Sequence, residues 1–168
     1  MRARCLLLHA MSHTASLPTS PEIAQHLVQQ QCAAQWRGFF QALAAEFAAA
    51  LPPEDLRALM ARVGARFAAE HPLPACATLD ELQGHMTQVW ERIDWGWVRL
   101  SQEVAHVDIQ HSVSPVSAAF GPDHAQWSGG FLEGVYQVWF EQAGAGQLKV
   151  SEAAPADAWG CVHLQLTR

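Results

Sequence analysis

The sequence lacks clustered positive charge and long apolar runs. It carries 10 Lys and Arg against 16 Asp and Glu, which gives a formal net charge of −6, and basic residues never occur in a run. Binding to nucleic acid requires clustered cations that neutralise phosphates, so we expect no nucleic-acid partner. An acidic chain is also not drawn to anionic membrane surfaces, and no stretch approaches the ~18 apolar residues of a membrane span.

Motifs for metals and cofactors are missing as well. Nine histidines occur, but none lies in an HExxH, an HxH or a Cys/His cluster, and no glycine-rich phosphate loop is present. His106 and His163 fall on predicted strands and could face each other, although a surface role is favoured. The cysteines have no CxxC or zinc spacing and are expected to be reduced thiols: Cys5, Cys32, Cys76 and Cys161. The sequence therefore predicts neither a metal nor a cofactor.

The motifs of hydrolytic enzymes are incomplete. Ser128 stands in a sequence close to the nucleophile elbow G-x-S-x-G, but Gln126 replaces its first glycine. We interpret Ser128 as the N-cap of a helix instead. A glycosidase needs two paired carboxylates, and nothing marks a pair among the candidates Glu91, Asp94 and Glu133. These carboxylates are expected on solvated faces or at helix caps, and the chain is not expected to be an enzyme.

The chain is divided into a tail and one domain. Residues 1–20 are expected to form a disordered tail. Its basic and apolar residues imitate the start of a short export signal, which is the alternative, and Met11 could be the true start. Residues 21–168 show no linker and no internal repeat, so they are predicted to form a single domain.

Hydrophobic periodicity predicts four helices and four strands. Thr78 and Glu81 form a capping-box pattern that opens the third helix. The predicted helices are 21–50, 53–71, 78–93 and 127–142, and the predicted strands are 95–100, 104–111, 147–150 and 161–166, with a loop at 112–124. The fold class is therefore α+β, with N-terminal helices packed with a small antiparallel β-sheet and a late Gly-containing helix.

Two features point to contact surfaces. Seven tryptophans occur, of which we expect at least four in the core, and the flat face of an exposed indole suits interfaces and sugar rings. Gly130 and Gly134 are four residues apart in the last helix and expose backbone that another helix can approach closely. This contact could form within the subunit or between subunits, so both glycines are candidates for packing in an oligomer.

Three segments resemble the family of the cellulose synthase D subunit. They are 39–43, 80–100 with its Trp95-Gly96-Trp97, and 127–145 with its Leu132-Glu133-Gly134-Val-Tyr136-Gln-Val-Trp139. The last string is the most specific, and the resemblance runs from about Trp36 to the C-terminus. The chain departs from the family at Asp94, where glycine is usual, and in its N-terminal residues, which have no counterpart that we recognise.

The resemblance implies a non-catalytic accessory subunit of bacterial cellulose synthesis. Members of the family form ring-shaped homo-oligomers of eight, a tetramer of dimers, that guide β-1,4-glucan chains or scaffold synthase complexes for crystalline cellulose. Other cellulose synthase subunits and glucan are then the implied partners, and Gln35 and Trp36 are candidate lining positions for glucan. Without a clear signal peptide, we expect a cytoplasmic protein associated with the inner-membrane synthase complex, with the periplasm as the alternative.

Two other functions fit parts of the sequence. A small-molecule sensor domain could use His106 or His111 to hold a haem, because helices packed on a small sheet also suit ligand-binding regulatory folds. A hydrolase would use Ser128 or Glu133. The specificity of the motifs favours the accessory subunit over both.

Overall fold

The chain folds as an α+β domain, as the sequence predicts. The computed structural model describes residues 21–157 and 159–168, and the predicted tail 1–20, with its signal-like residues and Met11, lies outside them. The helices are α1 Pro21–Gln30, α2 Ala34–Ala50, α3 Pro53–Glu70, α4 Leu79–Arg92, α5 Val116–Phe120, the 3₁₀ turn η1 Pro122–His124, α6 Ala125–Ser128 and α7 Gly130–Gln142; the strands are β1 Trp97–Gln102, β2 Val107–Ser112, β3 Lys149–Ala154 and β4 Val162–Thr167.

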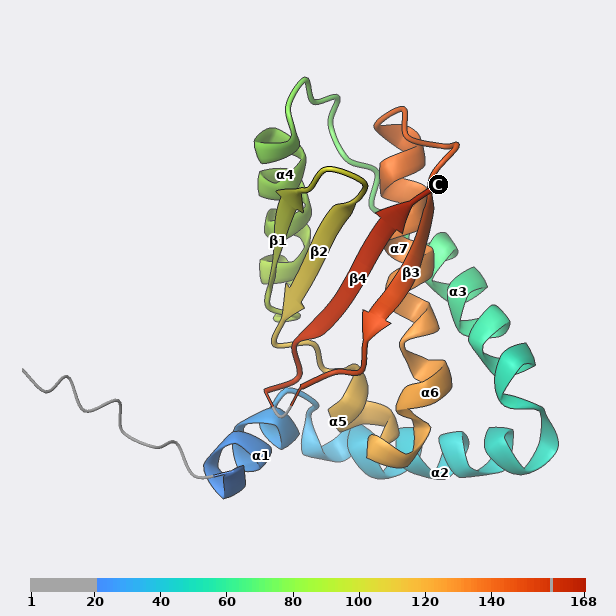
Figure 1. Cartoon of the computed structure of the whole chain (residues 1–168). Coiled ribbons are helices and arrows are strands. Elements are labelled where there is room, and N and C mark those ends of the chain that lie inside the picture. The colour runs from blue at the N-terminus through green and yellow to red at the C-terminus, as the bar shows by residue number, and fades with distance from the viewer. Residues whose placement is uncertain (1–20, 158) are drawn as a thin grey trace, which may run out of the picture.

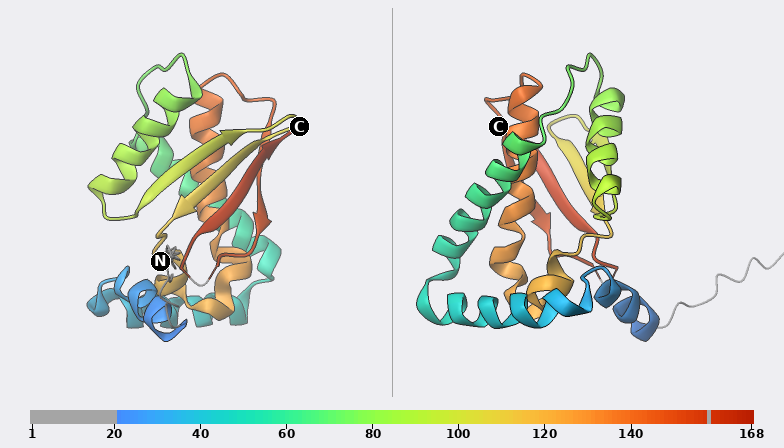
Figure 2. Two further views of the ribbon diagram at one scale, coloured as in Figure 1. Left: turned by 60° about the vertical axis from the view of Figure 1, so that its left-hand side comes forward. Right: turned by 180° about the vertical axis from the view of Figure 1, so that it is seen from behind.

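The four strands form one antiparallel sheet in the order β1-β2-β4-β3. Helices α4 and α7 pack on one face of it, α3 lies behind α7, and α1, α2 and α5 lie beyond one end (Figure 1, Figure 2). Alternate strand residues point toward the helices and are buried, because successive side chains of a strand face opposite ways. They include Val98, Leu100, Ile109, Val150, Val162, Leu164 and Leu166.

The helices complete this core with aromatic side chains. Trp90, Trp127 and Trp139 are buried, and Trp95 packs against the core as a partly buried residue. The prediction that at least four tryptophans belong to the core is thus confirmed. The N-cap at Thr78 is also confirmed, since the backbone N–H of Glu81 donates to the hydroxyl of Thr78 at 3.1 Å, whereas the carboxylate of Glu81 accepts from the N–H of Ala77, one residue before the cap, at 2.7 Å.

Both edges of the sheet are closed by side chains from the helices. At β1, Gln83 of α4 accepts a hydrogen bond from the backbone N–H of Leu100 at 2.7 Å, and at β3, Gln137 of α7 accepts one from Val150 at 2.8 Å. In the same way, the hydroxyl of Thr87 accepts from the backbone N–H of Val98, and the carboxylate of Glu133 accepts from the backbone N–H of Glu152. An open edge is a template for pairing with another strand. These contacts occupy two backbone N–H groups at each edge, so a strand could pair there only by displacing the side chains.

Helices α3 and α7 touch each other through their backbones. A Cβ on Gly130 would lie 2.6 Å from the carbonyl oxygen of Arg57, and a Cβ on Gly134 would overlap the carbonyl of Ala61. Gly64 of α3 approaches α7 in the same way. The glycine face of α7 is therefore filled by α3 of the same chain. The sequence allowed a contact within the subunit or between subunits, and the structure shows the contact within the subunit. The face is therefore not free for a second subunit.

Two predicted helices are split. The predicted helix 21–50 is interrupted at residues 31–33, where the guanidinium of Arg37 donates to the backbone carbonyl oxygens of Gln29 and Cys32. Such carbonyls at the end of a helix have no partner within it. The predicted helix 127–142 is interrupted at Gly129, next to a second glycine, and paired glycines permit such a change of direction.

The predicted loop 112–124 is wrong from residue 116 onward, where the chain forms α5 and η1. α5 has only 5 residues and buries Val116 and Ala118. The helix is too short to be detected from the sequence, because the apolar spacing that identifies a helix must be followed over a longer window. Gly121, with φ of 90°, separates the two elements.

Replacing Gly134 by Ala tests the contact between α3 and α7. The added methyl group would overlap the backbone of α3, so the two helices would have to separate. We expect the free energy of unfolding to fall by about 1–3 kcal/mol, the usual cost of overpacking. Urea titration followed by circular dichroism measures this change.

Gly84→Ala is the matched control for this variant. A Cβ at this position of α4 meets no atom within 4 Å, and Ala favours a helix over Gly, so this variant should be at least as stable as the wild type. Equal stability of Gly134→Ala and the wild type would contradict the close packing of the helices.

Candidate functional site

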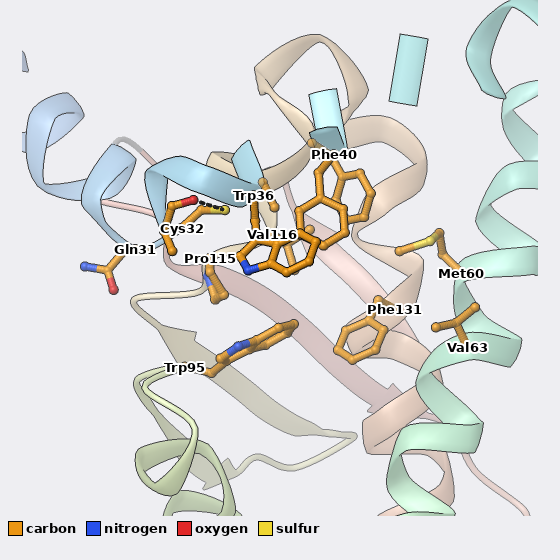
Figure 3. A pocket seen from close by; sticks show the side chains of 13 residues that line it. Gln31, Cys32, Trp36, Phe40, Met60, Val63, Trp95, Pro115, Val116 and Phe131 are labelled. Carbon is orange, nitrogen blue, oxygen red and sulfur yellow. Dashed lines mark hydrogen bonds between the residues drawn. The ribbon is translucent and has the colours of Figure 1, made fainter. Parts of the chain in front are cut away.

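An apolar pocket of about 330 Å³ opens where α2, α3, α5 and α7 meet the segment before β1 (Figure 3). Trp36 and Trp95 lie on two sides of it, and Met60, Phe131 and Val63 line its far wall. Nearly all of the lining is aromatic or aliphatic. The pocket can therefore hold a flat or apolar group, but it offers few hydrogen-bond partners.

Trp95 is placed by the turn between α4 and β1. Its backbone N–H donates to the carbonyl oxygen of Trp90 at 2.9 Å, and the two indoles stack with centroids 5.7 Å apart. The flanking Asp94 and Gly96 have φ of 58° and 78°, a region that glycine adopts without strain. This conformation gives a physical reason why glycine would suit the position of Asp94. It also explains why β1 begins at Trp97 and not at the predicted Trp95.

Helix α2 buries little of its own surface. Among its residues only Ala44 is fully buried. Trp36 and Phe39 are 52% and 56% exposed, and both contact Phe40, with ring centroids 6.2 and 5.6 Å from that of Phe40. Of the two predicted glucan-lining residues, Trp36 thus lies at the pocket, whereas Gln35 is exposed on α2 outside its lining.

Exposed apolar side chains gather in the first three helices. Nine large apolar side chains are exposed among the described residues, and six of them belong to residues 23–63. These six are Ile23, Leu27, Trp36, Phe39, Leu51 and Val63, and we call them the α1–α3 apolar surface. Within this set, Trp36 and Phe39 contact each other and Trp36 and Val63 line the same pocket. Apolar side chains that lie together on a surface mark an interaction site, whereas single ones are ordinary.

His111 is a core residue and not a ligand. It is fully buried, its Nδ1 lies 2.6 Å from the hydroxyl of Tyr136, and its Nε2 lies 2.8 Å from the carbonyl oxygen of Trp95. A carbonyl oxygen only accepts, so Nε2 carries the proton and donates, and Nδ1 accepts from the tyrosine. Burial lowers the pKa of His111 to about 4 and raises the pKa of Tyr136 well above its usual value. Both ring nitrogens are engaged, which leaves none for a haem.

The other predicted histidines do not meet. His106 precedes β2, and its Nε2 lies 3.1 Å from Asp108. His163 is on β4, opposite Gln110 of β2. The strand register thus separates the pair, and His106 belongs instead to a polar group on the outer face of the sheet.

The candidates for hydrolysis are engaged elsewhere or isolated. Ser128 is buried inside α6, and the residue that precedes α7 is Gly129, so the predicted N-cap role of Ser128 is wrong. The predicted solvated position of Glu133 is also wrong, because this carboxylate binds the guanidinium of Arg57 through both oxygens at 2.8 and 3.0 Å. Glu91 is exposed on α4. No nucleophile and base, and no free pair of carboxylates, come together among these residues.

Arg57 joins three elements at this point. Its Nη2 also lies 2.7 Å from Glu152 of β3, and its Nη1 donates to the carbonyl oxygen of Gln126. The hydrogen bond with Glu133, followed by that with Glu152, raises the pKa of Arg57. The group therefore remains charged and serves to tie α3 to α7 and β3.

Within 21–157 and 159–168, no three His, Cys, Asp or Glu side chains gather closely enough to hold a metal ion. No helix of these segments has both the length and the apolar character needed to cross a bilayer.

A family model that describes the cellulose synthase D subunit matches residues 22–165. The chain belongs to this family. Two relatives named cellulose synthase operon protein D, from Komagataeibacter xylinus and Komagataeibacter sucrofermentans, are each 31% identical to it over 110 residues, which covers 64% of this chain and 70% of each relative. The range that the family model matches contains α2, α7 and nearly all of the sheet, so the pocket and the apolar surface are parts of the family's domain.

Sequence reasoning found only part of this site. It selected Trp36 from the family resemblance, but it missed Trp95 and Phe131, which line the same pocket from distant parts of the chain. The signal that was available is the aromatic spacing at Trp36, Phe39 and Phe40, which sets three rings along one side of a helix. The spacing of these residues in the sequence could not show that the rings stay exposed.

The burial of His111 predicts how the stability of this cellulose synthase accessory domain depends on pH. As the pH falls from about 6.5, the usual pKa of histidine, toward about 4, the unfolded chain binds a proton that the folded chain excludes. This group should therefore lower the free energy of unfolding over that window, by about 3 kcal/mol in total.

Urea titrations at a series of pH values measure this effect. The control is His111→Gln, which keeps an amide donor without a titrating group. It is expected to be less stable at pH 7 but to lose less stability on acidification. The same pH slope in both proteins would contradict the assignment to His111.

Proposed function

We propose that this protein is a non-catalytic accessory subunit of bacterial cellulose synthesis that works as a ring-shaped homo-oligomer. The ring of eight subunits, a tetramer of dimers, guides β-1,4-glucan chains or scaffolds synthase complexes for crystalline cellulose. The relatives are named as products of a cellulose synthase operon, so other synthase subunits are the expected partners, and the expected place is the inner-membrane synthase complex. The observation that carries the assembly is the α1–α3 apolar surface.

The packing of α2 supports a role in assembly. A helix that is apolar on a wide face normally buries that face in its own core. Here Phe39 and Trp36 remain more than half exposed, and α2 rests on the domain mainly through α5. A second subunit that covered Phe39 and the other side chains of this surface, with Trp36 left open toward the path of glucan, would remove their apolar area from water, the main favourable term in association.

The closed sheet edges restrict the way in which subunits can join. Strand addition is a common route to open-ended assembly, but Gln83 and Gln137 already bond to the backbone at the two edges. Contact through helical faces is compatible with a closed ring, because the same patch then recurs at symmetric interfaces. The proposal therefore assigns the interface to α1–α3 and not to the sheet.

Gln35 and Trp36 are the residues that we propose to line the path of glucan. They are consecutive residues at the start of α2 and both are exposed, so the indole can stack on a sugar ring and the amide can bond to sugar hydroxyls. The non-catalytic role is supported by the engagement of Glu133 with Arg57 and of His111 with Tyr136. In these contacts, Glu133 and His111 serve the structure of the domain.

Light scattering coupled to size-exclusion chromatography tests the assembly. Eight subunits of 18.4 kDa have a mass of about 147 kDa, and we expect the wild-type protein to elute with this mass. Phe39→Asp places a charge on the α1–α3 apolar surface, where burial of a charge is costly, and should reduce the mass to that of smaller species.

Val104→Asp is the matched control, because Val104 is fully exposed in the turn between β1 and β2. This variant should keep the mass of the wild type. A monomer or a plain dimer in the wild type would remove the basis of the ring. A Phe39→Asp protein of unchanged mass would move the interface away from α2.

A further inference from the structure

The face of the sheet opposite α4 and α7 carries planar polar side chains in rows. The register sets Arg99, Gln110 and His163 directly opposite one another on β1, β2 and β4, and Asp108 opposite Gln165 in the next row. These side chains are exposed or partly exposed. A guanidinium, an amide and an imidazole thus lie side by side across three strands, at the strand spacing of about 4.8 Å.

A hollow of about 340 Å³ lies over these rows. On β3 it is bounded by Ala154, which stands opposite His163 beside a bulge and leaves space because its side chain is small. Within it, the side-chain amide of Gln165 donates to Oδ1 of Asp108 at 3.2 Å, and Nε2 of His106 lies 3.1 Å from the same oxygen. These contacts fix the carboxylate and orient the amide oxygen of Gln165 away from it.

Trp97 extends the same face. It stands two residues before Arg99 on β1, so its side chain points to the same side of the sheet, and it is 48% exposed. Arg99 forms no ion pair with any residue that the structure describes. The face therefore combines the exposed indole of Trp97 with the guanidinium of Arg99, whose N–H groups can donate to a ligand.

The charges and edges restrict the partner. Arg99 and Lys149 give this face two positive groups against the carboxylate of Asp108, so the field that could attract an ionic partner is weak. A peptide that adds as a strand would need an open edge, and both edges are closed. A neutral molecule with many hydroxyl groups matches a surface of amide, imidazole, guanidinium and carboxylate groups, since hydroxyls both donate and accept.

We propose that this outer sheet face binds a neutral, flat sugar chain of the β-1,4-glucan type. The indole of Trp97 stacks on one sugar ring, and Arg99, Gln110, His163 and Gln165 bond to the hydroxyls of the rings that follow. The identity of the ligand rests on the role in cellulose synthesis proposed above. The site itself is separate, because it uses the sheet and not Gln35 and Trp36 of α2.

Titration of the full-length protein with cellopentaose, followed by calorimetry, tests this site. Trp97→Ala should weaken binding at least ~5-fold, because stacking on an indole supplies much of the contact, and Gln110→Ala should weaken it in the same direction. Trp159→Ala is the matched control, because Trp159 is similarly exposed, at 42%, but lies in the loop before β4, and it should bind as the wild type does. Maltopentaose, whose α-linked chain coils, should bind more weakly than cellopentaose.

Several outcomes would overturn the proposal. It fails if the wild type does not bind cellopentaose, if Trp97→Ala binds as the wild type does, or if maltopentaose binds equally well. It also fails if Trp97→Ala reduces the mass of the oligomer, because the face would then be a subunit contact.

The same measurements separate this site from the proposed assembly. If Trp36→Ala abolishes binding and Trp97→Ala does not, the sheet site is wrong and the function proposed for α2 stands. If the wild type is monomeric but binds cellopentaose through Trp97, the sheet site stands and the ring is wrong.

Discussion

The contact of α7 with α3 is the constraint on which the rest of the structure depends. Gly130 and Gly134 bring the two backbones so close that a side chain on either glycine would overlap α3. This closeness sets the position of α7, and α7 in turn carries the side chains that bond to the sheet. Tyr136 bonds to His111 on β2, and Gln137 bonds to the edge of β3. A shift of α7 by the width of a methyl group would misplace all of these bonds together.

The polar groups of α7 serve structure at the edge of the sheet. Glu133 accepts both from Arg57 of α3 and from the backbone N–H of Glu152 on β3. Partly exposed ion pairs contribute little by themselves, about 0–1 kcal/mol. The side chains of Arg57 and Glu133 are 28% and 16% exposed, so the pair alone is a weak stabiliser. Its importance lies in the geometry, because it holds the carboxylate where it closes the edge of β3.

The sequence predicted those features that are local and missed those that depend on a distant partner. The N-cap at Thr78 and the alternation of Val162, Leu164 and Leu166 involve neighbours in the chain, and both were found. The glycines of α7 were recognised as a close-packing face, but spacing alone could not say whether the partner was α3 or another subunit. The position of Ser128 was missed because it ends the separate helix α6, and the meeting of Trp36 with Trp95 and Phe131 depends on the tertiary fold.

What the fold leaves uncovered limits how the protein can act. The titratable side chains considered for chemistry are bonded to one another or to backbone: His111 and Tyr136 in the core, and Arg57 and Glu133 at its partly exposed margin. A group held in this way is positioned for stability, since freeing it would leave a buried polar atom unpaired. Two kinds of surface remain among the described residues: the apolar side chains of α1–α3 and the polar outer face of the sheet. Apolar surface favours protein contact, and a planar polar face with an indole favours sugar. Because the two proposed surfaces lie on different elements, the contact proposed for a neighbouring subunit and the contact proposed for a sugar chain do not compete for the same side chains of the sheet.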